Sequence, residues 1–315
     1  MPDAVPKVSV AMPVYNAAIY LAQAVESILS QTFADFEFII INDGSTDESQ
    51  RMLETYAARD SRVRLISRPN TGLTKALNES VTLARGIYYA RMDADDISFP
   101  DRLREQVAYL DANPDCLVVG CRVELIDPEG QVLGEVWRFE SHDQIDAAHL
   151  GGQGGAIVHP SALMRLDALK QIGCYHAHNE PAEDLDLFLR LAEIGRLAKL
   201  PDVLFQYRMH FKSVGHTRRM EQSATVARVV NDARARRGLP LIDPSTMALS
   251  APPHPSVHFL NWASLAMKYG NRPLSAKYAL RALRLAPMSI HGWSIIARLM
   301  LPRRFFQTHG PGFKG

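Results

Sequence analysis

The sequence has few cysteines, no long hydrophobic run and, after residue 243, no acidic residue. Its three cysteines, Cys116, Cys121 and Cys174, cannot all pair and do not have the spacing of metal ligands, so we expect free thiols in a reducing compartment. No segment has 18 consecutive apolar residues, which argues against a membrane-spanning helix. The first residues, "MPDAVPKVSVAMPVY", have no basic start followed by an apolar run. We therefore expect no signal peptide and a cytoplasmic location.

Several motifs of nucleotide-binding and hydrolytic enzymes are also missing. There is no G-x-x-x-x-G-K-[ST] sequence, no G-x-G-x-x-G after the first predicted strand, and no G-x-S-x-G sequence. These absences exclude a P-loop nucleotidase, an ordinary dinucleotide-binding enzyme and a hydrolase with a nucleophile elbow. The chain of 315 residues, 47% of them hydrophobic, is nevertheless long enough for one large domain with an appendage.

Charge is distributed unevenly along the chain. From Pro244 onward there are 9 basic residues and no acidic residue, whereas residues 1–243 contain 26 basic and 34 acidic residues, a net charge of −8. This asymmetry suggests an acidic partner for the tail, either a membrane surface or nucleic acid. Trp262 and Trp293 have a spacing that suits burial better than base stacking, so we expect no nucleic-acid partner.

The first half of the chain alternates between strand and helix patterns. The segments "KVSVAMPVY", "FEFIIIND", "VRLIS" and "IYYARMD" read as buried strands, and helices are predicted between them. Asn16 is the expected cap of the first helix, Asp47 and Glu48 suit the first turn of the second, and the third should run from Thr71 to Ala84. Continuous apolar strands that alternate with helices predict an α/β fold with a mostly parallel, Rossmann-like sheet flanked by helices.

Beyond this region the pattern changes. The segment "CLVVGCRVELID-PEG-QVLGEVWRF" predicts an antiparallel hairpin, and helices are expected at 161–172, 183–194 and 220–237. The glycine-rich "GGQGG" at 151–155 reads as a flexible loop or lid. The Pro- and Ser-rich stretch 244–256 is the predicted linker between a domain at 1–243 and a small basic helical tail at 257–315.

Three polar clusters follow predicted strands: "PVYN", "NDGS" and "MDADD". Because ligands of open parallel sheets bind beyond the carboxyl ends of the strands, these clusters should share one edge. Asp93, Asp95 and Asp96 follow a buried strand directly, where like charges repel. The repulsion is tolerable if Asp93 and Asp95 hold a divalent cation with a phosphate behind it. A plain capping loop that includes Asp96 is the alternative.

Five ordered blocks carry a family resemblance: "VSVAMPVYNAAIYLAQAVESILSQTF", "FIIINDGSTDES", "NTGLTKALN", "YYARMDADDISFPDRL" and "PAEDLDLFLRL". They closely resemble family 2 glycosyltransferases, which are inverting enzymes of the GT-A fold, and the resemblance covers about residues 7–220. The resemblance implies transfer of a hexosyl or N-acetylhexosaminyl group from a nucleotide-diphosphate donor. The implied cofactor is Mn²⁺ or Mg²⁺, the implied donor a UDP-sugar, and the implied acceptor a hydroxyl of a glycan or glycolipid in cell-surface polysaccharide or lipopolysaccharide synthesis.

The resemblance also assigns roles to particular residues. Asp184 would be the general base, with Glu183 beside it. Asp95 would hold the metal, and Asp93 would contact ribose or metal. His210 would be a further metal residue, in a segment at 206–216 where Arg208, His210 and Ser213 could close over the diphosphate. His159 would shape the acceptor region. The remaining nucleotide-binding residues implied by the resemblance are Pro13, Tyr15, Asn16, Asp43 (toward the base) and Lys75.

Alternatives stay open at this point. Asp184 could be only a helix-start carboxylate. A sugar-1-phosphate nucleotidyltransferase would need a Gly-rich loop after the first strand, where "PVYNAAIY" has none. A non-catalytic, membrane-docked nucleotide-sugar-binding module would not need Asp184. The chain lacks the Q-x-x-R-W signature of processive synthases, so a single-addition transferase is favoured over a polymerase.

Two interpretations of the tail also remain. The stretch "WSIIARLMLPRRFF" mixes apolar residues with Arg298, Arg303 and Arg304, as in segments that lie in an anionic membrane interface. Such binding would make the protein peripheral on the inner face of the cytoplasmic membrane. The other interpretation is a helical appendage packed on the catalytic domain.

Overall fold

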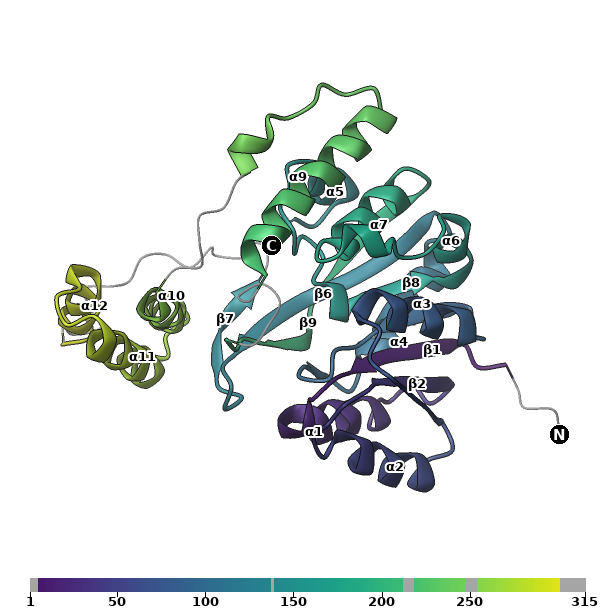
Figure 1. Ribbon diagram of the computed structural model, residues 1–315, viewed down its shortest axis with the longest axis horizontal. Coiled ribbons are helices and arrows are strands. Elements are labelled where there is room, and N and C mark those ends of the chain that lie inside the picture. The colour runs from purple at the N-terminus through teal and green to yellow at the C-terminus, as the bar shows by residue number, and fades with distance from the viewer. Residues whose placement is uncertain (1–4, 137–138, 212–217, 248–253, 301–315) are drawn as a thin grey trace. The chain divides into compact units, whose positions relative to one another are not determined.

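The computed structural model describes residues 5–136, 139–211, 218–247 and 254–300 (Figure 1). The chain forms two compact units. The first contains residues 1–125 and 136–251, and the second contains residues 126–135 and 252–315. Each unit is described by itself below.

The strands of the described residues form a nine-stranded sheet in the order β3-β2-β1-β4-β8-β6-β9-β5, with β7 paired to β6. The pairs β1–β2, β2–β3 and β1–β4 are parallel, whereas β4–β8, β6–β8 and β5–β9 are antiparallel. The strands are β1 (Val8–Val14), β2 (Phe36–Asp43), β3 (Val63–Arg68), β4 (Tyr88–Arg91), β5 (Ile97–Ser98), β6 (Cys116–Ile126), β7 (Val132–Val136), β8 (Leu163–Arg165) and β9 (Arg196–Arg208).

Helices cover both faces of this sheet (Figure 1). Those of the first unit are α1 (Ala18–Leu29), α2 (Ser49–Arg59), α3 (Leu73–Leu83), α4 (Arg102–Ala112), α5 (His142–Leu150), α6 (Leu166–Gln171), α7 (Glu183–Ala192) and α9 (Arg219–Arg236), with short 3₁₀ turns at η1 (His159–Ser161), η2 (Ala177–Asn179) and η3 (Pro244–Met247). The predicted α/β fold with a mostly parallel sheet in its N-terminal half is confirmed.

Side-chain alternation along the strands explains why both faces are apolar. On β1, Val10 and Met12 belong to a core with α1, α2 and α4, while Ala11 points to the opposite face. There it joins a second core formed with α3, α5, α6 and α7. Successive strand side chains point to opposite faces, so a continuous apolar strand buries side chains in both cores.

Two details of the sequence prediction are wrong. The helix predicted at 161–172 is instead strand β8 followed by the short α6. Because β8 lies between β4 and β6, sheet pairing overrides the helical spacing of its apolar residues. Asn16 does not cap α1: it has a positive φ of 51°, and its Oδ1 accepts from the Thr46 N–H at 2.8 Å. The first N–H groups of that region are satisfied by Asp47 and Ser49 instead.

The second unit consists of the tip of the β6–β7 hairpin and helices α10 (Pro255–Lys268), α11 (Arg272–Leu285) and α12 (Ile290–Met300). Trp262 and Tyr278 pack edge to face at 5.0 Å between α10 and α11. The Tyr278 hydroxyl donates to Asp127 of the hairpin at 2.6 Å, and Lys277 lies 3.2 Å from the same carboxylate. This basic tail therefore pairs part of its charge with the hairpin.

None of the helices in the described parts of the chain is both long and apolar enough to span a lipid bilayer.

Candidate active site

An open cleft of about 1460 Å³ lies in the first unit, beyond the carboxyl ends of β1 and β4. Pro13, Tyr15 and Asn16 enter it after β1, and Asp93 and Asp95 enter it after β4. Other elements contribute, among further residues, Glu183 and Asp184 at the start of α7, Tyr207 near the end of β9 and His210 just after it. The structure thus brings most of the site residues assigned from the sequence together in one cleft. Asp43, Lys75 and Arg208 are not among its described lining residues, and Ser213 lies outside the described residues.

The acidic turn after β4 is the most charged part of the cleft. One carboxylate oxygen from each of Asp93, Asp95 and Asp96 lies within 4.8 Å of the others. Residues 94 and 95 form a turn, and the three carboxylates converge around it. His210 Nε2 lies 2.7 Å from Asp95 Oδ2, and Arg91 donates to Asp93 at 2.6 Å.

The electrostatics of this turn fit a divalent cation. Burial raises the pKa of Asp93. The Arg91 guanidinium opposes this rise, and the charge of Asp95 adds to it. Burial, with the charges of Asp95 and Asp93, raises the pKa of Asp96 well above its ordinary value. Asp96 Oδ2 is buried and has no hydrogen-bond partner among the described residues. Oxygen ligands crowded in this way are a donor set that Mg²⁺ or Mn²⁺ accepts.

Arg208 supports this turn from behind. It is buried, its backbone N–H donates to Asp96 Oδ1 at 2.8 Å, and its Nε donates to the Asp95 carbonyl at 2.7 Å. Its guanidinium also lies over the ring of Tyr20, 4.5 Å from the centroid. Arg208 is not among the described residues that line the cleft, so it holds the acidic turn rather than facing a diphosphate. Ser213 lies outside the described residues.

Asp184 and Glu183 occupy the first turn of α7 and face the same cleft. Asp184 Oδ1 accepts from the Leu185 N–H at 2.8 Å, and the residue keeps partial exposure to the cleft. Burial raises the pKa of Asp184, while nearby N–H groups and Arg91 oppose the shift. Glu183 is only 7% exposed, its Oε2 has no partner among the described residues, and burial beside Asp184 raises its pKa to about 8.

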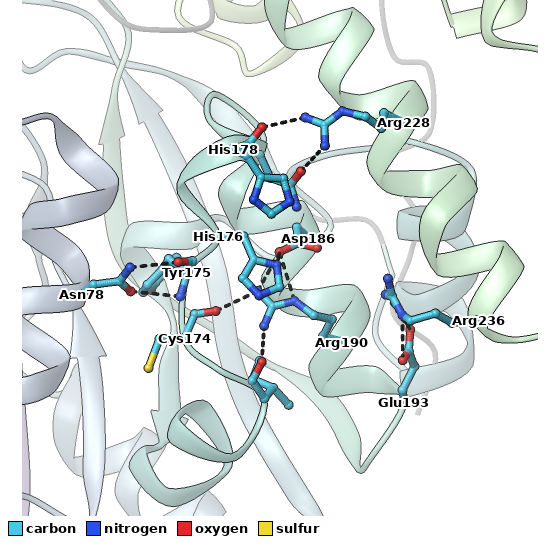
Figure 2. Close-up of polar contacts among 12 residues, drawn as sticks. Asn78, Cys174, Tyr175, His176, His178, Asp186, Arg190, Glu193, Arg228 and Arg236 are labelled. Carbon is cyan, nitrogen blue, oxygen red and sulfur yellow. Dashed lines mark hydrogen bonds and ion pairs between the residues drawn. The ribbon is translucent and has the colours of Figure 1, made fainter.

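A buried ion-pair network fixes the loop that leads to these carboxylates (Figure 2). Arg190 of α7 donates to Asp186 Oδ2 at 2.6 Å and to the carbonyls of Ile172 and Cys174 at 2.7 and 2.8 Å. His176 Nδ1 lies 3.2 Å from the same Asp186 oxygen. Asp186 is therefore occupied as a structural anchor, and it is not among the residues that line the cleft.

Further contacts tie the same loop to neighbouring helices (Figure 2). Asn78 of α3 donates to the Tyr175 carbonyl at 2.8 Å and accepts from its N–H at 3.0 Å. Arg228 of α9 donates to Asn179 Oδ1 and to the His178 carbonyl, each at 2.6 Å. The loop before Glu183 is thus bonded on both sides, which holds the start of α7 in place.

The residues predicted to bind the nucleoside fall into two groups. Pro13, Tyr15 and Asn16 line the cleft, and Tyr15 is 54% exposed. Asp43 is buried, pairs with Arg68, and accepts from the Thr71 and Gly72 N–H groups at 2.9 Å each. Lys75 is exposed on α3. Neither of these last two is among the described lining residues, and their assignment stays a prediction.

Arg91 is the residue that sequence reasoning missed. It is 1% exposed, lies at the end of β4, and lines the cleft beside Asp93. Its charge opposes the burial-driven rise in the pKa of both Glu183 and Asp184. Because it also pairs with Asp93, it offsets negative charge both at the turn after β4 and at the start of α7. An arginine within an apolar strand, two residues before an aspartate, is the signal that could have found it.

Sequence comparison identifies the relatives of this chain. The family model described as Glycosyl transferase family 2 matches residues 9–173. "Putative glycosyltransferase EpsE" of Bacillus subtilis (strain 168) is 35% identical over 243 residues, which cover 76% of this chain and 85% of the relative. "O-antigen biosynthesis glycosyltransferase WbnJ" of Escherichia coli is 35% identical over 211 residues, or 65% of this chain and 81% of that protein.

Solved structures share the fold at low sequence identity. S. aureus TarS in complex with UDP-GlcNAc has a TM-score of 0.60 at 15% identity, covering 95% of this chain and 82% of that one. Mannosyltransferase PcManGT from Pyrobaculum calidifontis, in complex with GDP-Man and Mn²⁺, has a TM-score of 0.57 at 21% identity. The match covers 94% of this chain and 80% of that one. The sequence matches and the shared fold together show that the chain belongs to glycosyl transferase family 2 and has the GT-A fold.

Proposed function

We propose that the protein is an inverting, metal-dependent glycosyltransferase that moves a hexosyl or N-acetylhexosaminyl group from a nucleotide-diphosphate donor to a hydroxyl of a glycan or glycolipid. The observation that carries this proposal is the meeting of Asp95 and Asp184 in one cleft. Asp95 suits the diphosphate side of the donor, where a metal would bind, and Asp184 suits the acceptor hydroxyl. The relative named for O-antigen biosynthesis supports a role in cell-surface polysaccharide or lipopolysaccharide synthesis.

In this proposal Asp184 is the general base. Its carboxylate takes the proton of the acceptor hydroxyl while the oxygen of that hydroxyl forms a bond to the anomeric carbon. The bond between the anomeric carbon and the donor phosphate oxygen breaks at the opposite face, and its electron pair leaves with the nucleoside diphosphate. Attack opposite the leaving group inverts the configuration. The buried Arg91 favours the ionised form of Asp184 that a base requires.

Asp93, Asp95 and His210 are the residues proposed to hold Mn²⁺ or Mg²⁺ at the diphosphate. A bound divalent ion would neutralise charge on the departing diphosphate. His210 already lies 2.7 Å from Asp95, so it either joins the ligands or orients that carboxylate from behind. The neighbour solved with GDP-Man and Mn²⁺ supports the metal, and the neighbour solved with UDP-GlcNAc supports UDP as the first donor nucleoside to test.

The test is a panel of UDP- and GDP-sugars mixed with the full-length protein and Mn²⁺. We expect one donor to raise the melting temperature, to lose this effect when a chelator is added, and to be hydrolysed slowly without acceptor. Stabilisation without turnover toward any hydroxyl acceptor would favour the non-catalytic binding module instead. Release of pyrophosphate when the protein is given a nucleoside triphosphate and a sugar 1-phosphate would favour the nucleotidyltransferase.

We also propose that the second unit binds an anionic membrane surface, which would place the protein at the inner face of the cytoplasmic membrane. The side chains of Ile290, Trp293 and Met300 on α12 are 86%, 56% and 82% exposed, and Arg298 lies on the same helix. Exposed apolar groups next to basic groups match an anionic interface, where each basic residue contributes roughly 1 kcal/mol.

Sedimentation with liposomes tests the membrane proposal. Binding to vesicles that contain an anionic lipid, weakened by salt and by replacing both Trp293 and Ile290 with serine, is expected. Absence of binding to anionic vesicles at low salt would reject it without affecting the proposed chemistry of the cleft.

A further inference from the structure

The glycine-rich loop at residues 151–155 is anchored at its start. The N–H groups of Gly151, Gly152 and Gln153 donate to carbonyls of α5 at 2.9–3.0 Å, which closes the end of that helix. Gly152 has a φ of +74°, and a Cβ added there would lie 3.0 Å from a methyl carbon of Met247. The start of the loop is therefore packed against α5 and Met247.

The end of the loop is open and faces the proposed active site. Gly154 and Gly155 line the same cleft as Asp184, and a Cβ added at either would meet no atom of the described residues within 4 Å. Among the described residues, no backbone donor bonds the carbonyl oxygen of either glycine. Ile157 and Val226 line the cleft as well, so open peptide groups and apolar side chains occur together.

Glu183 provides a second and independent sign of a ligand. Its side chain is more than nine-tenths buried, it lines the cleft next to Asp184, and its Oε2 has no partner in the described structure. A buried polar atom without a partner costs free energy, which a ligand hydroxyl could offset. Because burial beside Asp184 raises the pKa of Glu183 to about 8, this carboxyl carries a proton at neutral pH and can donate it in a hydrogen bond.

We propose that Glu183 and the open glycines Gly154 and Gly155 form the acceptor subsite, which binds a neutral sugar ring. The C–H face of the ring would lie against the glycine backbone and the apolar wall. One ring hydroxyl would reach Asp184, and a second would bond Glu183. Glu183 is in this view a positioning residue that acts as a neutral acid, so the reaction has one carboxylate base. This inference deepens the proposed glycosyl transfer and rests on it.

The first experiment uses a graded set of loop variants. Gly154 has no positive φ, so side chains are tolerated there, and Gly154→Ala and Gly154→Phe progressively fill the open space. Gln153→Phe is the matched control, because Gln153 is exposed in the same loop and is not among the lining residues. Transfer is measured from the hydrolysable donor to a panel of p-nitrophenyl hexosides and N-acetylhexosaminides. Donor hydrolysis without acceptor is measured on the same preparations.

We expect Gly154→Phe to lower kcat/KM for the glycoside at least tenfold. Its rate of donor hydrolysis should stay within twofold of the wild-type rate, and its melting temperature should stay within a few degrees of the wild-type value. Gln153→Phe should transfer as well as wild type. Equal transfer by Gly154→Phe overturns the inference. Donor hydrolysis by the wild type without transfer to any glycoside of the panel also overturns it, whereas absence of all donor hydrolysis contradicts the proposed function itself.

The second experiment separates a neutral acid from a carboxylate at Glu183. Glu183→Ala should raise KM for the glycoside at least tenfold with little change in KM for the donor. Glu183→Gln keeps a hydrogen-bond donor of the same length, so it should restore most of the loss. If Glu183→Gln is as defective as Glu183→Ala, or if both lower kcat at saturating acceptor by ~100-fold or more, Glu183 acts in its ionised form and the assignment is wrong.

Discussion

Replacing Asp184 by asparagine removes one negative charge and keeps the shape of the side chain. The asparagine amide would retain an oxygen that can accept from the Leu185 N–H, the bond that Asp184 makes at 2.8 Å. The cap at the start of α7 should therefore survive, and the loss of a carboxylate whose pKa burial raises should not lower stability. We expect a melting temperature equal to or above that of the wild type.

The catalytic consequence should be large. General bases contribute typically about 10²–10⁴-fold, or roughly 3–5 kcal/mol of barrier, so kcat should fall by this factor while donor affinity is kept. The pH dependence of kcat gives a second test of this role. Only ionised Asp184 can accept the proton, so wild-type kcat should fall as pH decreases through its raised pKa, and the variant should lack this limb. The profile is measured at saturating metal and donor, because the metal-binding carboxylates also titrate.

Asp186 is the matched control, since it lies two residues further along the same helix. Its carboxylate is 5% exposed and pairs with Arg190 rather than facing the cleft. Asp186→Asn should cost stability, on the order of 3 kcal/mol for a broken buried pair, with turnover per folded molecule largely preserved. If Asp184→Asn is well folded and turns over nearly as fast as the wild type, or if Asp186→Asn shows the larger loss of kcat at equal folding, the assignment of the base is refuted.

Two further outcomes follow from the same cleft. Asp95→Asn should abolish the Mn²⁺-dependent increase in melting temperature with UDP and leave the melting temperature of the free protein nearly unchanged, because the side chain is 31% exposed; an undiminished metal effect would exclude Asp95 as a ligand. Burial raises the pKa of Glu183 from 4.5 to about 8, so its stabilising contribution is complete below pH 4.5 and lost as pH rises through 8. Glu183→Gln should therefore gain in melting temperature over the wild type as pH rises across this window, and a constant difference would contradict the raised pKa.

The parallel half of the fold could be predicted from the sequence because its strands are buried on both faces. Continuous apolar segments such as "FEFIIIND" have only one stable environment, the middle layer between two helical layers. The antiparallel half of the fold could be predicted less well from the sequence. Strand β8 has three residues, Leu163–Arg165, and its pairing with β4 and β6 depends on partners more than 40 residues away in sequence. Local spacing cannot carry that information, which is why a helix was predicted there.

The site shows the same division between local and distant information. Asp93 and Asp95 could be found because acidic groups that directly follow a buried strand are costly unless a partner offsets their charge. The role of Asp184 is implied only by the family resemblance, because its place at the start of a helix is equally typical of a helix-start carboxylate. The helix partner Arg190 could not be found from spacing, since its carbonyl acceptors on Ile172 and Cys174 lie 18 and 16 residues away along a loop with irregular backbone. The loop before α7 is held by contacts of Arg190 and Arg228 with its carbonyl oxygens and with Asn179, which no periodic pattern encodes.

Asp184 and Asp186 have different surroundings although they lie in one helical turn. Asp186 faces Arg190 four residues later, the spacing at which helix side chains meet, and His176 completes its surroundings. Asp184 points instead into the cleft, where backbone N–H groups and the buried Arg91 oppose the burial-driven rise in its pKa. A carboxylate with few compensating partners has a raised pKa and is the stronger base. The helix thus anchors the loop through Asp186 and leaves Asp184 facing the cleft, where the proposed mechanism needs a base.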